Sequence, residues 1–384
     1  MESTTNSTAA LGLLGLPREI LIMLPDYLHN IEDYMNVAST CRTLREAMST
    51  AHPHTILCLA WESTRIFFRP SPSFLICAVA RDLGNWARES DENEAELASG
   101  MPRGIDHLVD LALRKKQCGL TMDDIRKLHG LRFSVINPVA DLIDKCIGEQ
   151  WYQTPNFWNG GVDDAYTINA EAPQTLFDLA TYGELFGPDF EPFVDSLSSR
   201  RMLKVDTRLE FVKYYMPDYA VRCFEAARDI KRPDGSYDPR RAIVIHPDGP
   251  YDDNNEYQRS GTYNVIALKW LMKSSRWRPH WRKARLDAGA GPDFAASIYE
   301  DNANWRQIML ENVMQCQGLE GLGMILPGTD IAEQYKPKIR EWREKIGRIK
   351  EEPATTRVGI WDTHKYPDLW GDLWICSSGY VFGS

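Results

Sequence analysis

Apolar residues recur at intervals of three and four along most of this chain, and this periodicity limits the folds that it can adopt. Positions three or four apart lie on one face of an α-helix, whereas alternating positions, which are scarce here, mark strands. The segments 74–86 and 335–349 carry the clearest stripes. The pattern predicts an all-α fold, and because no segment repeats another at a fixed period, regular helical repeats are not expected.

Short polar breaks separate the further helices that the sequence predicts. The expected segments are 105–113, 122–131, 138–147, 174–185, 203–230 with a bend near Pro217, 264–273 and 305–316. Thr121 and Asp124 are spaced as a capping box, in which a hydroxyl and a carboxylate satisfy free backbone donors at a helix start. The acidic stretch 89–96 is expected to be a solvated loop. The length of 384 residues fits a small module followed by one larger domain.

Two apolar stripes in the first fifty residues predict a compact helical unit. The first stripe, over 16–28, is interrupted by Pro25, which cannot donate a helical hydrogen bond, so a break is expected there. The second, over 34–48, has the spacing of an amphipathic helix, with Asp33 available as its cap. Such a unit hides too little apolar surface to be robust alone, so it needs the rest of the chain or another protein.

The order of these elements resembles the F-box family over residues 14–52. The run Leu16-Pro17-x-Glu19-Ile20-Leu21-x-x-Leu24 and the later Thr40-Cys41-Arg42-Thr43-Leu44-Arg45 match its pattern of Leu-Pro, an Ile/Leu-rich helix and a Cys-basic-x-Leu-Arg segment. The whole chain also resembles fungal F-box proteins with long helical C-terminal regions, through runs at 118–124, 156–161 and 316–323. The alternative is that these fifty residues are the first helices of a larger helical domain.

The resemblance implies partners and site residues. F-box modules insert into the helical C-terminal part of a Skp-family adaptor, which holds a cullin scaffold and a RING subunit. By position, the implied adaptor contacts are Leu16, Pro17, Ile20, Leu21 and Leu24, with Val37, Cys41 and Leu44 holding the helices together or joining the edge of the interface. The implied layout is a disordered stretch 1–13, the F-box 14–52, a linker 53–70 and a helical target-binding domain 71–384.

The function that this resemblance implies is target recognition in an SCF-type (cullin-RING) ubiquitin ligase, without catalysis by this chain. Two other interpretations stay open. One is a non-catalytic scaffold that uses the F-box outside target degradation. The other is a helical enzyme with an F-box-like N-terminus, which would require a pocket that gathers the region of His246 with other polar groups.

A basic segment at 273–285 is the candidate for target binding, because it combines six Lys or Arg residues with two tryptophans. Arg and Trp are enriched at interaction hot spots and on surfaces that bind phosphate or stack on bases. The candidate contacts with an acidic or phosphorylated target are Arg276, Trp277, Arg278, Trp281 and Arg282. The alternative is a solvated basic segment whose tryptophans pack into the core.

No local motif predicts a metal, a cofactor or a catalytic residue. The cluster His246, Asp248, Asp252, Asp253 and Glu256 offers oxygen ligands, but Asp253 stands where a calcium loop needs Gly, so a solvated loop is expected. His52 and His54 lack further ligands at helical spacing. The glycines at 318, 321 and 323 do not form the dinucleotide fingerprint, and they predict a tight turn after a helix.

The amino-acid composition limits the classes of partner that this chain is expected to bind and the cellular compartment in which it is expected to fold. The net charge of -10 argues against a general binder of nucleic acid or of anionic membranes. The eight cysteines are widely spread without a CxxC pair, so they are expected to be free thiols in a reducing compartment. Residues 1–15 do not resemble a signal peptide, and no apolar run is long enough to cross a bilayer. These features predict a cytoplasmic or nuclear protein.

Overall fold

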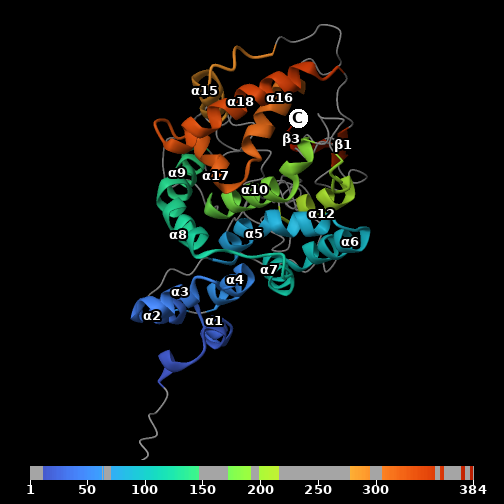
Figure 1. The fold of residues 1–384 in the computed structure, drawn as a ribbon. Helices are drawn as coiled ribbons and strands as arrows, with labels where there is room; N and C mark the ends of the chain where they lie inside the picture. The colour runs from blue at the N-terminus through green and yellow to red at the C-terminus, as the bar shows by residue number, and fades with distance from the viewer. Residues whose placement is uncertain are drawn as a thin grey trace, which may run out of the picture.

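The computed structural model describes residues 12–62, 64, 71–146, 172–191, 199–215, 277–294, 305–350, 355–358, 373–376 and 381–383. Most of this part is helical, in agreement with the prediction from periodicity. A small group of N-terminal helices projects from one end of a larger helical body (Figure 1). None of the helices in these ranges combines the length and the apolar character that a membrane span requires.

The N-terminal helices form a module of short elements. They are η1 (Leu13–Gly15), α1 (Arg18–Ile22), η2 (Leu24–Tyr27), α2 (Ile31–Thr40) and α3 (Arg42–Met48). The break expected near Pro25 is present, because α1 ends at Ile22 and Pro25 lies in the 3-10 turn η2. The second stripe is divided, since Cys41 has extended backbone angles between α2 and α3. The cap of α2 is Asn30 and not Asp33: the Asn30 side chain accepts a hydrogen bond from the Asp33 backbone N–H at 2.9 Å.

The larger body consists mainly of helices of nine to nineteen residues, joined by shorter helical turns and by the four-residue helix α17. They are α4 (Pro53–Trp61), α5 (Pro72–Ala87), α6 (Asp91–Gly100), η3 (Met101–Arg103), α7 (Ile105–Arg114), α8 (Met122–Leu131), the π-helical turn η4 (Arg132–Ile136), α9 (Asn137–Cys146), α10 (Ala172–Phe186), η6 (Gly187–Asp189), α12 (Val205–Tyr215), α15 (Arg278–Asp287), α16 (Trp305–Gln315), α17 (Gly318–Gly321), η7 (Leu322–Ile325) and α18 (Asp330–Arg348). Helices α5 and α10 pack along each other at the centre (Figure 1).

A short antiparallel sheet adds to this helical fold near the C-terminus. Its strands are β1 (Thr355–Val358), β2 (Leu373–Cys376) and β3 (Val381–Gly383), in the order β1-β2-β3. Thr355 lies opposite Cys376, and Leu373 lies opposite both Val358 and Gly383. Strands of three or four residues show too few alternations to produce a recognisable pattern in the sequence, so the sheet was not predicted.

Two segments predicted to lack helix are helical. The expected linker 53–70 contains α4, whose Ile56, Leu57, Leu59 and Ala60 are buried in the core, so the N-terminal helices continue directly into the body. The acidic stretch predicted as a loop forms α6, which begins after the cap Ser90. Glu94 on this helix is buried because the Arg201 guanidinium and the Thr207 hydroxyl both bind its carboxylate.

Candidate functional site

The N-terminal module has a small core of its own. Leu21 of α1 is buried against Leu44 and Ala47 of α3. Half-buried side chains surround these three residues: Leu16, Ile22, Leu24, Val37 and Cys41. Of the residues implied as adaptor contacts, Leu21 and Leu44 are therefore internal and hold α1 against α3. Pro17 and Ile20 are exposed instead.

A concentration of exposed apolar side chains distinguishes the module from the rest of the described chain. Among the described residues, eight large apolar side chains are exposed, and five of them lie between residues 13 and 27. These five, named here the apolar N-terminal segment, are Leu13, Leu14, Ile20, Met23 and Tyr27, with exposed fractions between 45% and 71%. Clustered exposed apolar side chains mark interaction surfaces in soluble proteins. The sequence prediction named Ile20 but missed Leu13, Leu14, Met23 and Tyr27, although Leu13 and Leu14 are separated from the Leu16-Pro17 pair only by Gly15.

Close backbone contacts fix α4, the helix that follows the module, to the rest of the body. The backbone N–H of Leu120 donates to the Pro53 carbonyl at 2.9 Å, and Nδ1 of His54 lies 3.0 Å from the Cys118 carbonyl oxygen. Between these two contacts, Gly119 lies directly against the start of α4. The segment that precedes α8 therefore holds α4 in place, and the buried Ile31, Tyr34 and Met48 of the module belong to the same core as Ile56 of α4.

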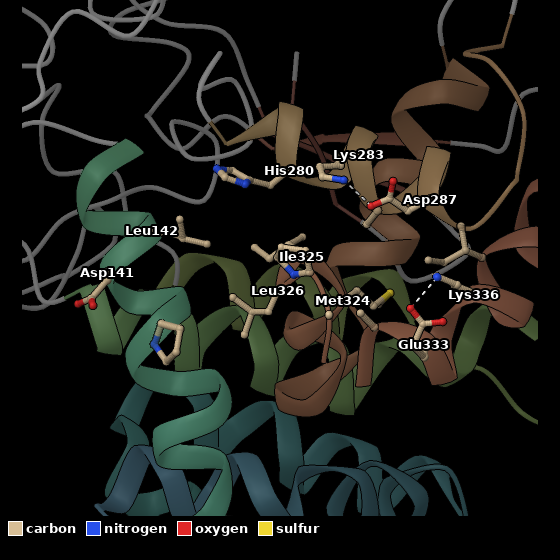
Figure 2. Close-up of a pocket in the computed structure, with 16 residues that line it drawn as sticks. Asp141, Leu142, His280, Lys283, Asp287, Met324, Ile325, Leu326, Glu333 and Lys336 are labelled. Atoms are coloured by element: carbon tan, nitrogen blue, oxygen red, sulfur yellow. Dashed lines mark hydrogen bonds and ion pairs between the residues drawn. The ribbon is translucent and has the colours of Figure 1, made fainter. Parts of the chain in front are cut away.

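A pocket of about 710 Å³ lies between α9, α15, η7 and α18. Figure 2 shows Leu142, Ile325 and Leu326 pointing into one side of it, while the Asp141 side chain points away. On the other side, Lys283 pairs with Asp287 and Lys336 pairs with Glu333, both at 2.6 Å. This volume falls in the range of about 300–1,000 Å³ that is typical of ligand-binding pockets.

His280 borders the apolar side of this pocket (Figure 2). Burial lowers the pKa of His280 from its ordinary value, because desolvation disfavours the charged imidazolium. The side chain is therefore a neutral hydrogen-bonding group at neutral pH. A neutral imidazole beside apolar side chains suits an uncharged part of a ligand better than an ionic one.

The basic segment does not present its tryptophans to a partner. Trp277 and Trp281 are fully buried, with ring centroids 5.7 Å apart in an edge-to-face arrangement. The Trp277 indole N–H donates to the Gln315 side chain at 2.9 Å. Their prediction as target contacts was wrong, because the helix α15 turns this face into the core.

The arginines of the same segment are engaged in ion pairs. Arg278 contacts Glu311 at 3.0 Å, and Arg282 contacts Asp293 at 3.1 Å. Arg276 lies outside the described residues. The part of α15 that reaches a binding cavity is its other face, with His280 and Lys283, which sequence reasoning did not single out.

The remaining polar candidates give no metal site in the described ranges. No group of three or more His, Cys, Asp or Glu side chains there could hold a metal ion. The cluster at 246–256 lies outside the described residues. Nδ1 of His52 accepts a hydrogen bond from the His54 backbone N–H at the start of α4. Of the three glycines predicted to form a turn after a helix, Gly318 has φ of 76° where the chain turns from α16 into α17, whereas Gly321 lies in α17 and Gly323 in η7.

The described cysteines agree with the expectation of free thiols. No disulfide bond joins any two of the described residues Cys41, Cys58, Cys77, Cys118 and Cys316. Burial raises the pKa of Cys118 to about 12, and burial also raises the pKa of Cys77. Both thiols are therefore protonated and unreactive at neutral pH.

Comparison with known proteins leaves the family of this chain open. No protein-family model matches it, and no match is found among curated proteins or among solved structures. The F-box resemblance therefore stays a prediction that rests on the residues of 14–52.

Proposed function

We propose that this protein is a substrate-recognition subunit of a cullin-RING ubiquitin ligase. In this proposal the N-terminal module binds a Skp-family adaptor, and the helical body binds the protein to be ubiquitinated. The observation that carries the proposal is the apolar N-terminal segment, whose five large side chains are left exposed on a module whose separate core consists of Leu21, Leu44 and Ala47. A helical partner that covered them would gain about 25 cal/mol for each Å² of apolar surface removed from water.

The implied adaptor contacts differ in how exposed their side chains are to a partner. Leu21 and Leu44 are buried inside the module, so they support the binding surface without forming it. Pro17 and Ile20 are exposed at the start of α1, where a partner can reach them. Helix α1 has only five residues, and a helix this short depends on tertiary contacts for its stability.

A receptor of this kind acts by positioning. Ile31, Tyr34 and Met48 of the module belong to the same buried core as the helices of the body, so a target held by the body stays at a fixed place relative to the adaptor. Holding a target lysine near a charged conjugating enzyme raises the effective concentration of the reacting groups. The pocket beside His280 is the candidate target-binding surface of the body.

The test is direct binding of a purified Skp-family adaptor, measured by isothermal titration calorimetry. Ile20→Asp and Leu14→Asp introduce charge into the apolar N-terminal segment without touching the buried core. Each buried apolar side chain contributes about 1.5 to 3 kcal/mol, so each variant should lose about ten- to hundredfold in affinity. The matched control is Leu286→Asp, which changes a similarly exposed leucine on α15.

Circular dichroism and thermal melting establish that the variants remain folded. Failure of the wild-type protein to bind the adaptor, or undiminished binding by Ile20→Asp and Leu14→Asp, would contradict the proposal. Co-purification of a cullin with the wild-type chain separates a ligase subunit from a scaffold that uses the adaptor alone.

A further inference from the structure

A second hollow, of about 540 Å³, lies where the N-terminal module meets the body. Its lining comes from α2, α3 and α4 and from the start of α8. In Figure 1, α8 stands directly above α2 and α3, which places this hollow at the junction of the two parts. Neither the resemblance nor the pocket beside His280 accounts for it.

The charges that line this hollow are predominantly positive. Arg45 of α3 and Arg126 of α8 supply two guanidinium groups, and Asp123 supplies the one carboxylate among the lining residues. Asp123 and Arg126 form an ion pair at 2.5 Å in which both side chains are largely exposed. Such exposed pairs contribute only about 0–1 kcal/mol, so a bound anion can compete with Asp123 for the guanidinium.

Arg45 is the more available of the two arginines. Within the described part of the chain it forms no ion pair, and its Nε makes only a long hydrogen bond of 3.4 Å to the Ala38 carbonyl. Its neighbour on the same helix, Arg42, differs because it pairs with Glu46 at 2.8 Å and does not line the hollow. The chain as a whole carries a net charge of -10, so excess positive charge here is a local feature.

The wall between these arginines is rigid and partly apolar. The Tyr34 hydroxyl donates to the Met48 carbonyl at 2.6 Å, which fixes the aromatic ring. Met35, Ile56 and Met122 add apolar surface to the lining. The hollow thus combines a planar cationic group on each of two elements with apolar side chains, an arrangement that suits a carboxylate next to an apolar residue.

We propose that this hollow binds an acidic segment of a partner protein, with a carboxylate held between Arg45 and Arg126 and an apolar neighbour against Met35 and Met122. A protein segment is favoured over a free anion because the apolar lining adds surface that a small anion would leave uncovered. The inference goes beyond the proposed function, since it concerns a different surface and does not require an adaptor.

The test measures binding of short synthetic peptides to the full chain by fluorescence polarisation, without adaptor. Three matched peptides carry a Leu-Glu-Glu-Leu, a Leu-Gln-Gln-Leu or a Leu-Lys-Lys-Leu core in a Gly/Ser background. The Glu peptide should bind about ten- to hundredfold more tightly than the Gln peptide, because hydrogen bonds to charged groups contribute about 1.5–3 kcal/mol. Raising the salt concentration should weaken binding of the Glu peptide.

Matched arginine variants locate the interaction. Arg45→Glu should lose the preference for the Glu peptide and favour the Lys peptide, whereas Arg42→Glu, on the same helix, should behave as wild type. Arg126→Gln should weaken binding of the Glu peptide. Both Arg42 and Arg45 are exposed, so neither variant is expected to unfold the chain.

Three outcomes would overturn the inference. They are equal binding of the Glu and Gln peptides, retention of the Glu preference by Arg45→Glu, and inorganic phosphate binding as tightly as the Glu peptide, which would indicate a site for small anions. The two proposals can fail separately. Ile20→Asp should lose adaptor binding and keep peptide binding, whereas Arg45→Glu should lose binding of the Glu peptide and keep adaptor binding.

Discussion

A Cβ atom on Gly119 would lie 2.6 Å from the Cβ of Pro53, so the segment before α8 and the start of α4 approach to a distance that only glycine permits. The same hypothetical atom would lie 2.7 Å from the Pro53 carbonyl carbon. Backbone atoms cannot rotate away as a flexible side chain can. The close approach also allows the hydrogen bond from Leu120 to Pro53, so Gly119 determines how α4, the helix that follows the N-terminal module, is attached to the segment before α8.

Gly119→Ala should therefore lower the free energy of unfolding. Overpacking of this kind costs about 1–3 kcal/mol, which chemical denaturation can measure. The matched control is Gly130→Ala in α8, where nothing lies within 4 Å of the added Cβ. That change should stabilise the protein by about 0.5–1 kcal/mol, because alanine loses less backbone freedom than glycine in a helix. A Gly119→Ala protein as stable as wild type would contradict this prediction, because it would show that the segment before α8 and the start of α4 can move apart without loss of stability.

Leu21 and Ile20 are neighbours with opposite expected roles. Leu21→Ala removes a buried side chain from the core that it shares with Leu44, and such changes cost about 2–5 kcal/mol. Ile20→Ala changes an exposed side chain and should alter stability by less than about 0.5 kcal/mol. Hydrogen exchange of the amides of α1 and α3 measures the difference locally. Equal protection in the two variants would contradict the assignment of Leu21 to the core of the module.

Asp189 is a buried carboxylate held by two arginines. Its Oδ1 accepts hydrogen bonds from Arg88 at 2.6 and 2.8 Å, and its Oδ2 accepts one from Arg208 at 3.1 Å. Asp189→Asn would remove the buried negative charge that both guanidinium groups contact, which should cost about 3–5 kcal/mol of stability. Asp123→Asn removes an exposed ion pair and should cost less than about 1 kcal/mol. Similar losses in thermal unfolding for both variants would contradict this difference.

The elements that the sequence predicted well are those determined by neighbouring residues. The capping box of Thr121 and Asp124 is present. Helix α8 begins at Met122, directly after the cap Thr121, and ends at Leu131 as predicted. The stripe of α18 is likewise confirmed, with Ile339 and Ile346 buried. Cap spacing and helical periodicity act within a few residues, so one sequence contains the information that they require.

The features that sequence reasoning missed depend on contacts between distant residues. Glu94 belongs to an acidic run that resembles a solvated loop, and it is buried only because Arg201 and Thr207, more than one hundred positions later, contact its carboxylate. The spacing of the tryptophans in the basic segment was compatible both with a binding surface and with packing into the core. Both cavities gather side chains from separate elements, such as Arg45 with Arg126, and periodicity within one element does not predict such pairs.

His280 should make stability depend on pH in the mildly acidic range. Its pKa is lower in the folded protein than its ordinary value because burial disfavours the imidazolium, so the unfolded state binds more protons as the pH falls below about 6.5. The free energy of unfolding should therefore decrease with falling pH, by at most about 1.4 kcal/mol per pH unit for one proton. The charged groups that line the same pocket are Asp141, Lys283, Asp287, Glu333 and Lys336.

Denaturant unfolding between about pH 5 and 7.5 measures the slope, and the His280→Gln variant should show a smaller slope than wild type because it lacks the titrating imidazole. His29→Gln, which changes an exposed histidine of the module, is the matched control. An unchanged slope in His280→Gln would mean that this imidazole takes up its proton equally well in the folded and unfolded chains, and the pocket would then be more hydrated than its apolar lining indicates.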